Sequence, residues 1–191
     1  GYISLITGNH DTIRARYTLS PDELKIAYAF LLTMPGVPFI YYGDEIGMRY
    51  LQLPTKEGGY FRTGSRTPMQ WSRGKNLGFS EADEQKLYLP VDNAADAPNV
   101  ADEEADPDSL LNTVREVIRF RIENPNLQAD GDFKVVQANK GSRLFAYKRG
   151  NLLLAVNPSK HEETLHAPSL REPAFRIGTD EVCKENTIIG P

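Results

Sequence analysis

Several polar side chains follow directly on a short apolar run near the start of the chain. The run is Tyr2 to Thr7, and Asn9, His10 and Asp11 come just after it, with Arg14 three residues further on. An imidazole beside a carboxylate at a strand end can take part in binding or catalysis, or the two groups can merely bond each other in a loop. A nearby arginine can clamp or orient a carboxylate. We call residues 9 to 11 the ledge, a candidate hydrogen-bonding surface.

A second acidic group follows another apolar run. Asp44 and Glu45 come just after Tyr41 and Tyr42. They could form an acid pair for cleavage of glycosidic bonds, or they could hold a structural rim. Because neighbouring residues on an extended chain point to opposite faces, the two carboxyls are poor candidates for facing catalytic groups, and the structural interpretation is favoured.

The segment from residue 49 to 107 has little apolar periodicity. Its aromatic and arginine side chains suit sugar faces and hydroxyls, or the loop packs on itself with Trp71 buried; they are Tyr60, Phe61, Arg66 and Trp71. Ten acids against one lysine between Glu81 and Asp108 predict a solvated, mobile face. A calcium loop is disfavoured because the alternating ligand spacing is absent.

Elements of a parallel α/β unit must position these groups. Tyr2 to Thr7 and Val37 to Tyr42 are apolar runs typical of buried parallel strands. Between them, residues 20 to 23 (Ser-Pro-Asp-Glu) form a capping-box signal that predicts a helix with Leu24, Ala27, Tyr28 and Leu31 on its apolar face. The ledge and Asp44-Glu45 then lie at the carboxyl ends of two strands joined by a crossover, where such folds bind ligands.

The rest of the chain predicts a further helix and an antiparallel meander. Asp108 to Glu123 carries apolar residues at helical spacing, at Leu111, Val114, Ile118 and Ile122. Residues 133 to 138, 143 to 149 and 152 to 157 are strand-like and are separated by glycine turns. We therefore predict an α/β domain over residues 1–125 and an all-β domain over 126–191.

Composition excludes several functional classes. The net charge is −4 with scattered basic residues, which argues against nucleic-acid binding, and the dinucleotide glycine pattern is missing. One cysteine, Cys183, allows no internal disulfide framework and no cysteine-based zinc site. His161 and His166 are expected to be ordinary surface residues. The start at Gly1, without an initiator methionine, suggests a fragment.

Three segments, in order, resemble the alpha-amylase superfamily of glycoside hydrolases. They are Gly-Asn-His-Asp at residues 8–11, Pro-Gly-Val-Pro-Phe-Ile-Tyr-Tyr-Gly-Asp-Glu-Ile-Gly-Met at 35–48, and Arg-Thr-Pro-Met-Gln-Trp at 66–71. With the downstream Gly-Phe-Ser at 78–80, the set is similar to the oligo-1,6-glucosidase, alpha-glucosidase and trehalose synthase branch. The match runs from residue 1 to about residue 157.

The resemblance implies a fold. The chain would be the C-terminal portion of a (β/α)8 TIM barrel, with residues 2–7 and 37–42 as strands seven and eight and 108–123 as the closing helix. A small antiparallel β-sandwich domain would follow.

The resemblance also implies roles for the ledge. Asp11 would be the catalytic carboxylate that stabilises the transition state, and His10, Asn9 and Arg14 would bind the sugar, Arg14 by analogy with exo-acting members. A retaining enzyme also needs a nucleophile and an acid/base. The family takes them from strands four and five, and neither motif occurs here, so we expect the fragment alone to be inactive.

No cofactor is implied for this part of the chain, although calcium is possible in the remainder of the parent enzyme. The implied partner is an alpha-linked oligosaccharide, with neither nucleic acid nor membrane. Exposed barrel edges predict self-association of the fragment. One alternative is a non-catalytic, amylase-like scaffold. Another is a carbohydrate-binding module formed by the late β segment, whose aromatics Phe133, Phe145, Tyr147 and Phe175 are more easily explained as core.

Overall fold

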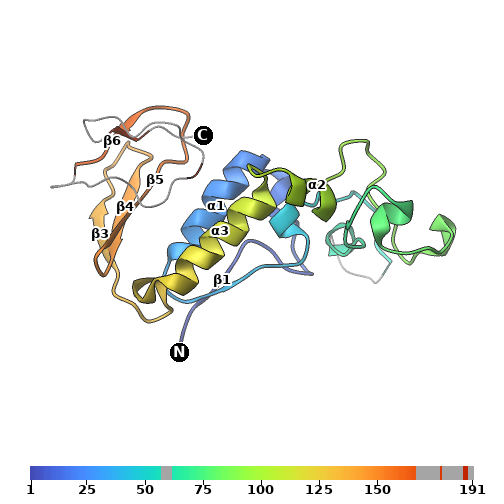
Figure 1. Cartoon of the computed structure of the whole chain (residues 1–191), viewed down its shortest axis with the longest axis horizontal. Coiled ribbons are helices and arrows are strands. Elements are labelled where there is room, and N and C mark those ends of the chain that lie inside the picture. The colour runs from blue at the N-terminus through green and yellow to red at the C-terminus, as the bar shows by residue number, and fades with distance from the viewer. Residues whose placement is uncertain (57–61, 167–176, 178–186, 189–191) are drawn as a thin grey trace. The chain divides into compact units, whose positions relative to one another are not determined.

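The computed structural model describes residues 1–56, 62–166, 177 and 187–188 (Figure 1). Its helices and strands follow the order β1 (Ser4–Ile6), α1 (Pro21–Thr33), β2 (Val37–Phe39), α2 (Val100–Ala105), α3 (Leu110–Glu123), β3 (Lys134–Gln137), β4 (Phe145–Arg149), β5 (Leu152–Val156), β6 (Glu163–Thr164) and β7 (Thr187–Ile188). Short 3-10 helices fill the connections: η1 (Ala15–Tyr17), η2 (Asp44–Ile46), η3 (Arg62–Ser65), η4 (Lys75–Gly78), η5 (Glu84–Lys86) and η6 (Pro125–Leu127). None of the described helices is long and apolar enough to cross a membrane.

The chain divides into two compact units by its internal contacts. Unit 1 comprises residues 1–4, 25–37 and 116–191, and unit 2 comprises residues 5–24 and 38–115. Helices α1 and α3 therefore each contribute residues to both units. This division differs from the predicted boundary after residue 125 because the second halves of both helices group with the β strands. The domain boundary itself stays a prediction.

Helix α1 begins with the predicted capping box. The Ser20 backbone N–H donates to Glu23 Oε2 at 2.7 Å, and the Glu23 N–H donates to Ser20 Oγ at 3.2 Å. These bonds satisfy amides that a helix start leaves without partners. Leu24 and Tyr28 of the predicted apolar face are almost fully buried. The helix ends before Gly36, whose φ of +102° is unfavourable for other residues.

Strands β1 and β2 pair in a two-stranded sheet, and both are shorter than predicted. The expectation that these strands are buried on both faces is wrong for this chain, because the side chains of both alternate between exposed and half-buried. Phe39 is 55% exposed. Among the described residues no third strand joins this sheet.

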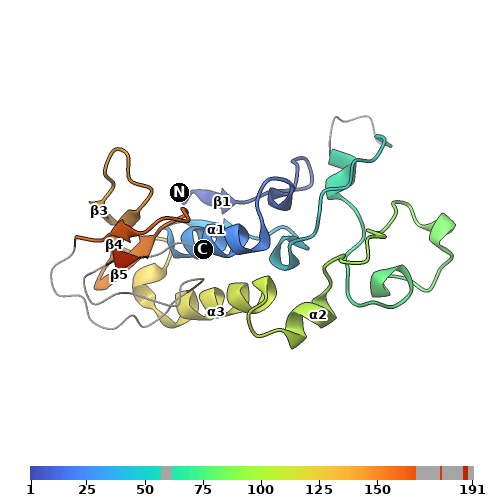
Figure 2. The same ribbon diagram turned by 90° about the horizontal axis from the view of Figure 1, so that it is seen from above.

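Helix α3 begins two residues after the predicted start and buries Leu111, Val114 and Val117. The prediction that Ile122 belongs to its apolar face is wrong, because Ile122 is 70% exposed and Arg121 takes the inward position. Arg121 Nη1 donates to the carbonyls of Leu32 (2.6 Å) and Met34 (3.0 Å). The second halves of α1 and α3, both in unit 1, run side by side in both views (Figure 1, Figure 2). The arginine is therefore used to bind the end of α1.

The predicted meander is confirmed as a three-stranded antiparallel sheet in the order β3-β4-β5. Gly141 and Gly150 have positive φ at its two turns. Leu144, Ala146 and Leu165 form the apolar core on this sheet. Tyr147 is fully buried, as expected for a core aromatic, and its ring contacts those of Phe145 and Phe133. The core interpretation is wrong for Phe133, which is 39% exposed. Strands β6 and β7 form a separate antiparallel pair, and the β-sandwich arrangement stays a prediction.

A second buried arginine lies on strand β4. Arg149 is fully buried and donates from Nε to the Asp132 carbonyl at 2.9 Å and from Nη2 to the Gln128 carbonyl at 2.6 Å. Its Nη1 donates to the carbonyl of Thr33, the last residue of α1. Burial lowers the pKa of Arg149 and also that of Arg121, which is further lowered by the neighbouring Arg149. The end of α1 is thus capped by two arginines from distant parts of the sequence.

The acidic segment is more ordered than the sequence suggests. Asp92 is 6% exposed and accepts from Arg49 Nε at 2.7 Å. Asp102 pairs with Arg73, and Asn99 caps α2 by accepting from the Asp102 N–H. The expectation of a wholly solvated face is therefore wrong at Asp92. Arg49 and Arg73, which lie outside the acidic run, pair with carboxylates of that run.

Candidate active site

The ledge is a tight turn that follows β1, in unit 2. The Asn9 side-chain oxygen accepts from the Asp11 N–H at 2.8 Å, and the Asn9 N–H donates to Thr12 Oγ1 at 2.9 Å. The Thr12 N–H in turn donates to the Asn9 carbonyl at 3.3 Å. A side chain that mimics the backbone in this way is typical of asparagine in turns. Asn9 therefore shapes the turn and leaves the next two side chains facing outwards.

His10 and Asp11 are the exposed groups of the ledge. Their side chains are 65% and 52% exposed, and His10 Nε2 lies 3.2 Å from Asp11 Oδ2. Desolvation raises the pKa of Asp11, but the neighbouring His10 and two arginine hydrogen bonds outweigh it, so the pKa lies below the usual carboxyl value. Asp11 is consequently an ionised, accessible carboxylate at neutral pH.

Two arginines from and beside η3 hold the outer side of the ledge. Arg66 Nη2 donates to Asp11 Oδ1 at 2.9 Å and Arg62 Nη1 donates to the same oxygen at 3.4 Å. Arg66 Nε also donates to the His10 carbonyl at 2.8 Å, and Ser65 Oγ donates to the Thr12 carbonyl. The sequence left Arg66 as either a group suited to sugar hydroxyls or part of a self-packed loop, and it did not indicate Arg62. No local pattern links either arginine to Asp11, which lies more than fifty residues away in the sequence.

Arg14 lies beneath the ledge. It is 1% exposed, and its Nη1 donates to Asp44 Oδ1 and to the Tyr42 carbonyl, both at 2.7 Å. The guanidinium carbon lies 4.8 Å from the ring centre of Tyr41 and 5.0 Å from that of Tyr42. Arg14 orients a carboxylate, as predicted, but the carboxylate is that of Asp44. Because the group is buried, it is not placed at the surface where a sugar would bind.

Asp44 and Glu45 occupy η2, which begins after a left-handed Gly43 (φ +81°). Burial raises the pKa of Asp44, against the lowering effects of Arg14 and Thr7. Burial also raises the pKa of Glu45, whose Oε2 has no hydrogen-bond partner among the described residues. Asp44 is therefore buried and Glu45 is half-buried, which agrees with the structural interpretation and not with a facing acid pair.

The loop aromatics are only partly described. Trp71 is 50% exposed, so the alternative in which it is buried is wrong. Tyr60 and Phe61 lie outside the described residues, as do Cys183 and Phe175. The hydroxyls of Tyr41 and Tyr42 donate to the carbonyls of Ser65 (3.2 Å) and Thr67 (2.7 Å). The two tyrosines before Asp44 thus anchor the segment that supplies Arg66.

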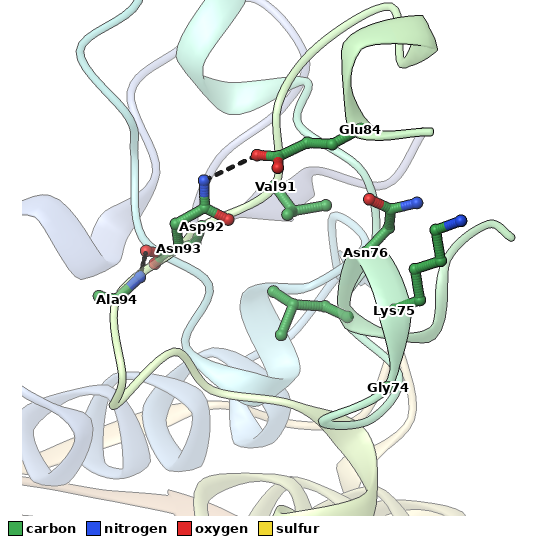
Figure 3. Close-up of a pocket in the computed structure, with 9 residues that line it drawn as sticks. Gly74, Lys75, Asn76, Glu84, Val91, Asp92, Asn93 and Ala94 are labelled. Atoms are coloured by element: carbon green, nitrogen blue, oxygen red, sulfur yellow. Dashed lines mark hydrogen bonds between the residues drawn. The ribbon is translucent and has the colours of Figure 1, made fainter. Parts of the chain in front are cut away.

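A hollow of about 360 Å³ lies elsewhere in unit 2 and contains no ledge residue (Figure 3). It is lined by residues 74–77, Glu84 and residues 91–94. Its polar groups already bond within the chain, since Asn93 Nδ2 donates to Glu84 Oε1 at 3.0 Å and Asn76 Nδ2 donates to the Ser80 carbonyl at 2.7 Å. No cluster of potential metal ligands occurs among the described residues. The ledge therefore remains the candidate site.

The chemistry of the ledge follows from its charges. An accessible carboxylate stabilises a positive charge that develops next to it, and an exposed imidazole and guanidinium donate hydrogen bonds to hydroxyls. A neutral, polyhydroxylated ligand with a cation-like transition state suits this set.

A comparison with protein families finds one match, described as "Alpha amylase, catalytic domain", over residues 1–130. The chain is 31% identical to a salivary alpha-glucosidase of Aedes aegypti over 88% of the chain and 31% of that protein. It is 30% identical to a probable oligo-1,6-glucosidase of Bacillus subtilis over 86% of the chain and 35% of that protein. The chain thus spans about a third of the length of these curated relatives.

Solved structures show the same fold. A mutant of trehalulose synthase MutB superposes with a TM-score of 0.74 at 24% identity, covering 99% of this chain and 41% of that one. A mutant trehalose-6-phosphate hydrolase of Bacillus licheniformis gives a TM-score of 0.73 at 22% identity, covering 88% of this chain and 36% of that one. The trehalulose synthase structure covers almost the whole chain, and so includes the β strands after α3.

Proposed function

Because the chain belongs to the alpha-amylase family of catalytic domains, we propose that it forms one wall of a site that cleaves or transfers alpha-glucosidic bonds of oligosaccharides. The observation that carries the proposal is the accessible, ionised Asp11 beside His10 at the end of β1. Relatives named alpha-glucosidase, oligo-1,6-glucosidase and trehalose synthase support the substrate class.

Asp11 stabilises the transition state in this proposal. An oxocarbenium-like sugar carries positive charge at the reacting carbon, and a fixed carboxylate lowers the energy of that charge. His10 donates a hydrogen bond to a sugar hydroxyl. Asn9 and Arg14, predicted as sugar-binding residues, instead support the ledge, because Asn9 shapes the turn from within and Arg14 is buried beneath it.

The attacking and proton-donating groups come from outside this chain. The carboxyls that follow β2 point into the fold, and Asp44 is bonded to Arg14. A retaining enzyme separates its two catalytic carboxyls by about 5 Å across the scissile bond, an arrangement that Asp11 alone does not provide. We therefore propose that the chain by itself turns over no glucoside, and that the parent protein acts with retention of configuration.

The remaining structural expectations are part of the same proposal. The strands after α3 belong to a β-sandwich, and the exposed β1–β2 sheet is covered by further barrel strands in the parent protein. In the isolated chain this surface drives self-association. Sedimentation of the chain as a stable monomer at micromolar concentration would contradict that part.

The test is the Asp11→Asn substitution in the complete protein that contains this chain. We expect kcat on an aryl alpha-glucoside to fall by at least about a hundredfold, since one preorganised electrostatic contact contributes about that much. Asp130→Asn, an exposed aspartate in unit 1, is the matched control. Unchanged turnover by Asp11→Asn would refute the role of Asp11. Hydrolysis of the aryl alpha-glucoside by the chain alone would refute the proposal that the attacking and proton-donating groups lie outside it.

The same measurements test the non-catalytic alternative. A scaffold would bind maltooligosaccharides without turnover in the unmodified complete protein, and Asp11→Asn would then alter only affinity. Binding by a fragment that begins at residue 126 would favour the interpretation of the late β strands as a carbohydrate-binding module.

A further inference from the structure

The ledge turn is tied at both of its ends to one buried carboxylate. Thr7, just before the turn, donates from Oγ1 to Asp44 Oδ2 at 3.3 Å. Arg14, just after it, donates to the other oxygen, Oδ1, at 2.7 Å. Asp44 therefore joins the two ends of the backbone turn that carries His10 and Asp11. Its Oδ2 bonds Thr7 before the turn, and its Oδ1 bonds Arg14 after it.

The space beneath the turn is shaped for this carboxylate. A side chain at Gly8 would place its Cβ 3.3 Å from Asp44 Oδ2, closer than most such contacts. Gly8 is buried, and Asp44 is 3% exposed. The absence of a side chain at residue 8 thus lets the carboxylate approach the turn from below.

Arg14 is held through one of its nitrogens. Nη1 donates to the Tyr42 carbonyl as well as to Asp44, and the guanidinium lies over the rings of Tyr41 and Tyr42. Nε and Nη2 are buried without a hydrogen-bond partner among the described residues, so the two Nη1 bonds and the ring contacts hold the group. The end of the ledge turn is therefore fixed to the residues just after β2.

The outer contacts of the ledge act on its tip. Arg66 donates to Asp11 Oδ1 at 2.9 Å and to the His10 carbonyl at 2.8 Å, and Arg62 reaches Asp11 at 3.4 Å. The Asp11 side chain is half exposed, and exposed ion pairs contribute little to stability. The buried carboxylate therefore holds the two ends of the turn, and the two arginines hold its tip.

We propose that Asp44 is a positioning residue, which through Thr7 and Arg14 fixes where the Asp11 carboxylate stands. Its role in catalysis rests on the proposed function above, whereas its effect on the geometry of the ledge does not. A carboxylate misplaced by about 1 Å can cost a hundredfold in rate.

The experiment compares Asp44→Asn with Asp92→Asn. Asp92 is the matched control, because it is also buried and also accepts from an arginine at 2.7 Å, in the same unit. Thr7→Val is a milder variant that removes one contact to Asp44 and leaves its charge. The first readout is the carbon-13 titration of the Asp11 carboxyl in the 191-residue chain. Its charged neighbours are His10, Arg62 and Arg66.

A positioning role and a purely electrostatic role predict different results. If Asp44 positions the turn, its loss loosens the Asp11 contacts, and the pKa of Asp11 rises towards the usual value of about 3.9. If Asp44 acted only through its negative charge, the pKa of Asp11 would not change, because the raised pKa of Asp44 leaves that group already protonated where Asp11, whose pKa is lowered, titrates. We expect a rise in Asp44→Asn, a smaller rise in Thr7→Val and no change in Asp92→Asn. A fall or no change in Asp44→Asn, or an equal rise in Asp92→Asn, would overturn the proposal.

The second readout is kinetic and uses the complete protein. Asp44→Asn should lower kcat at least about tenfold while KM stays within about threefold, because the lost interaction acts in the transition state. Equal losses in Asp44→Asn and Asp92→Asn would show a purely structural role. If the complete protein hydrolyses no glucoside, the proposed function fails, but the Asp11 titration still decides whether Asp44 positions the turn.

Discussion

Buried arginines are used differently in the two compact units. In unit 2, Arg14 pairs with a carboxylate, that of Asp44, and lies over two tyrosine rings. In unit 1, Arg121 and Arg149 donate to backbone carbonyls, several of them at the end of α1. The carboxyl end of a helix carries partial negative charge, so it can replace an acidic side chain as the counter-charge.

The arginine–carboxylate pair of unit 2 is specific to its sequence, whereas the arginine–carbonyl bonds of unit 1 are not. A carboxylate must be encoded at one position, and it can lose its charge by taking up a proton. Backbone carbonyls exist in every sequence and cannot be titrated. The Arg14 contact should therefore depend on pH and should hold the ledge in place. The Arg149 contact should not depend on pH and should stabilise the fold.

The largest expected effect is that of Arg149→Met. It leaves the carbonyls of Thr33, Gln128 and Asp132 buried without their donor. Unsatisfied buried acceptors cost about 1–3 kcal/mol each, with some relief from relaxation, so we expect a loss of about 4 kcal/mol in the free energy of unfolding. Urea denaturation measures it, with Arg143→Met on the exposed surface as control. A loss no larger than the control's would break the comparison.

A smaller effect is expected for Arg14→Met. It leaves Asp44 buried without its cationic partner, which costs about 3 kcal/mol at neutral pH. Burial already raises the pKa of Asp44, and removing Arg14 raises it further. An acid whose pKa is raised in the folded state stabilises that state as pH falls, so the loss should shrink between pH 7 and pH 5. The Arg149→Met loss should stay constant over the same range.

Urea titrations of both variants at the two pH values check this contrast. A double variant, Arg14→Met with Asp44→Asn, should be less destabilised than the sum of the single variants, because no unpaired charge is left. Strict additivity would mean that Arg14 and Asp44 do not act as a pair.

The smallest effect on stability is expected for Arg66→Gln, on the exposed side of the ledge. The thermal midpoint should stay unchanged within error, since exposed ion pairs contribute little. The pKa of Asp11, which Arg66 helps to lower, should rise. A depressed pKa contributes stability that is present above the unfolded-state value and lost as pH falls through the folded value. In Arg66→Gln that loss should therefore be smaller and should be complete at a higher pH, while the pH at which it begins stays the same.

Carbon-13 titration of Asp11 measures this shift. Arg73→Gln is the control, since Arg73 forms a similar exposed pair with Asp102. A shift of Asp11 in the control variant would point to a general change in surface charge.

Local patterns predicted much of the fold. The capping box at Ser20 and Glu23, the turn glycines 141 and 150 and the apolar face of α1 all depend on residues close in sequence, and all are confirmed. Ile122 was misassigned because its inward neighbour, Arg121, binds carbonyls almost ninety residues away. Long-range contacts of this kind leave no periodic signal.

The same distinction between local and long-range contacts applies to the candidate site. The motif located His10 and Asp11, and the residue types suggested that Arg14 orients a carboxylate. Which carboxylate it orients could not be derived, because Asp44 reaches Arg14 only after α1 brings the two strand ends together. Arg62 and Arg66 approach Asp11 from more than fifty residues away. Their role required the structure.

The contrast in exposure between Asp11 and Asp44 has a consequence for ionic strength. Dissolved salt screens charges in water over about 10 Å at 0.1 M, but it hardly reaches a buried pair. Asp11 is 52% exposed and Asp44 is 3% exposed. Salt therefore weakens the contacts of Arg62 and Arg66 with Asp11 and leaves those of Asp44 intact. The ledge is a turn whose base is insensitive to the ions around it and whose tip responds to them.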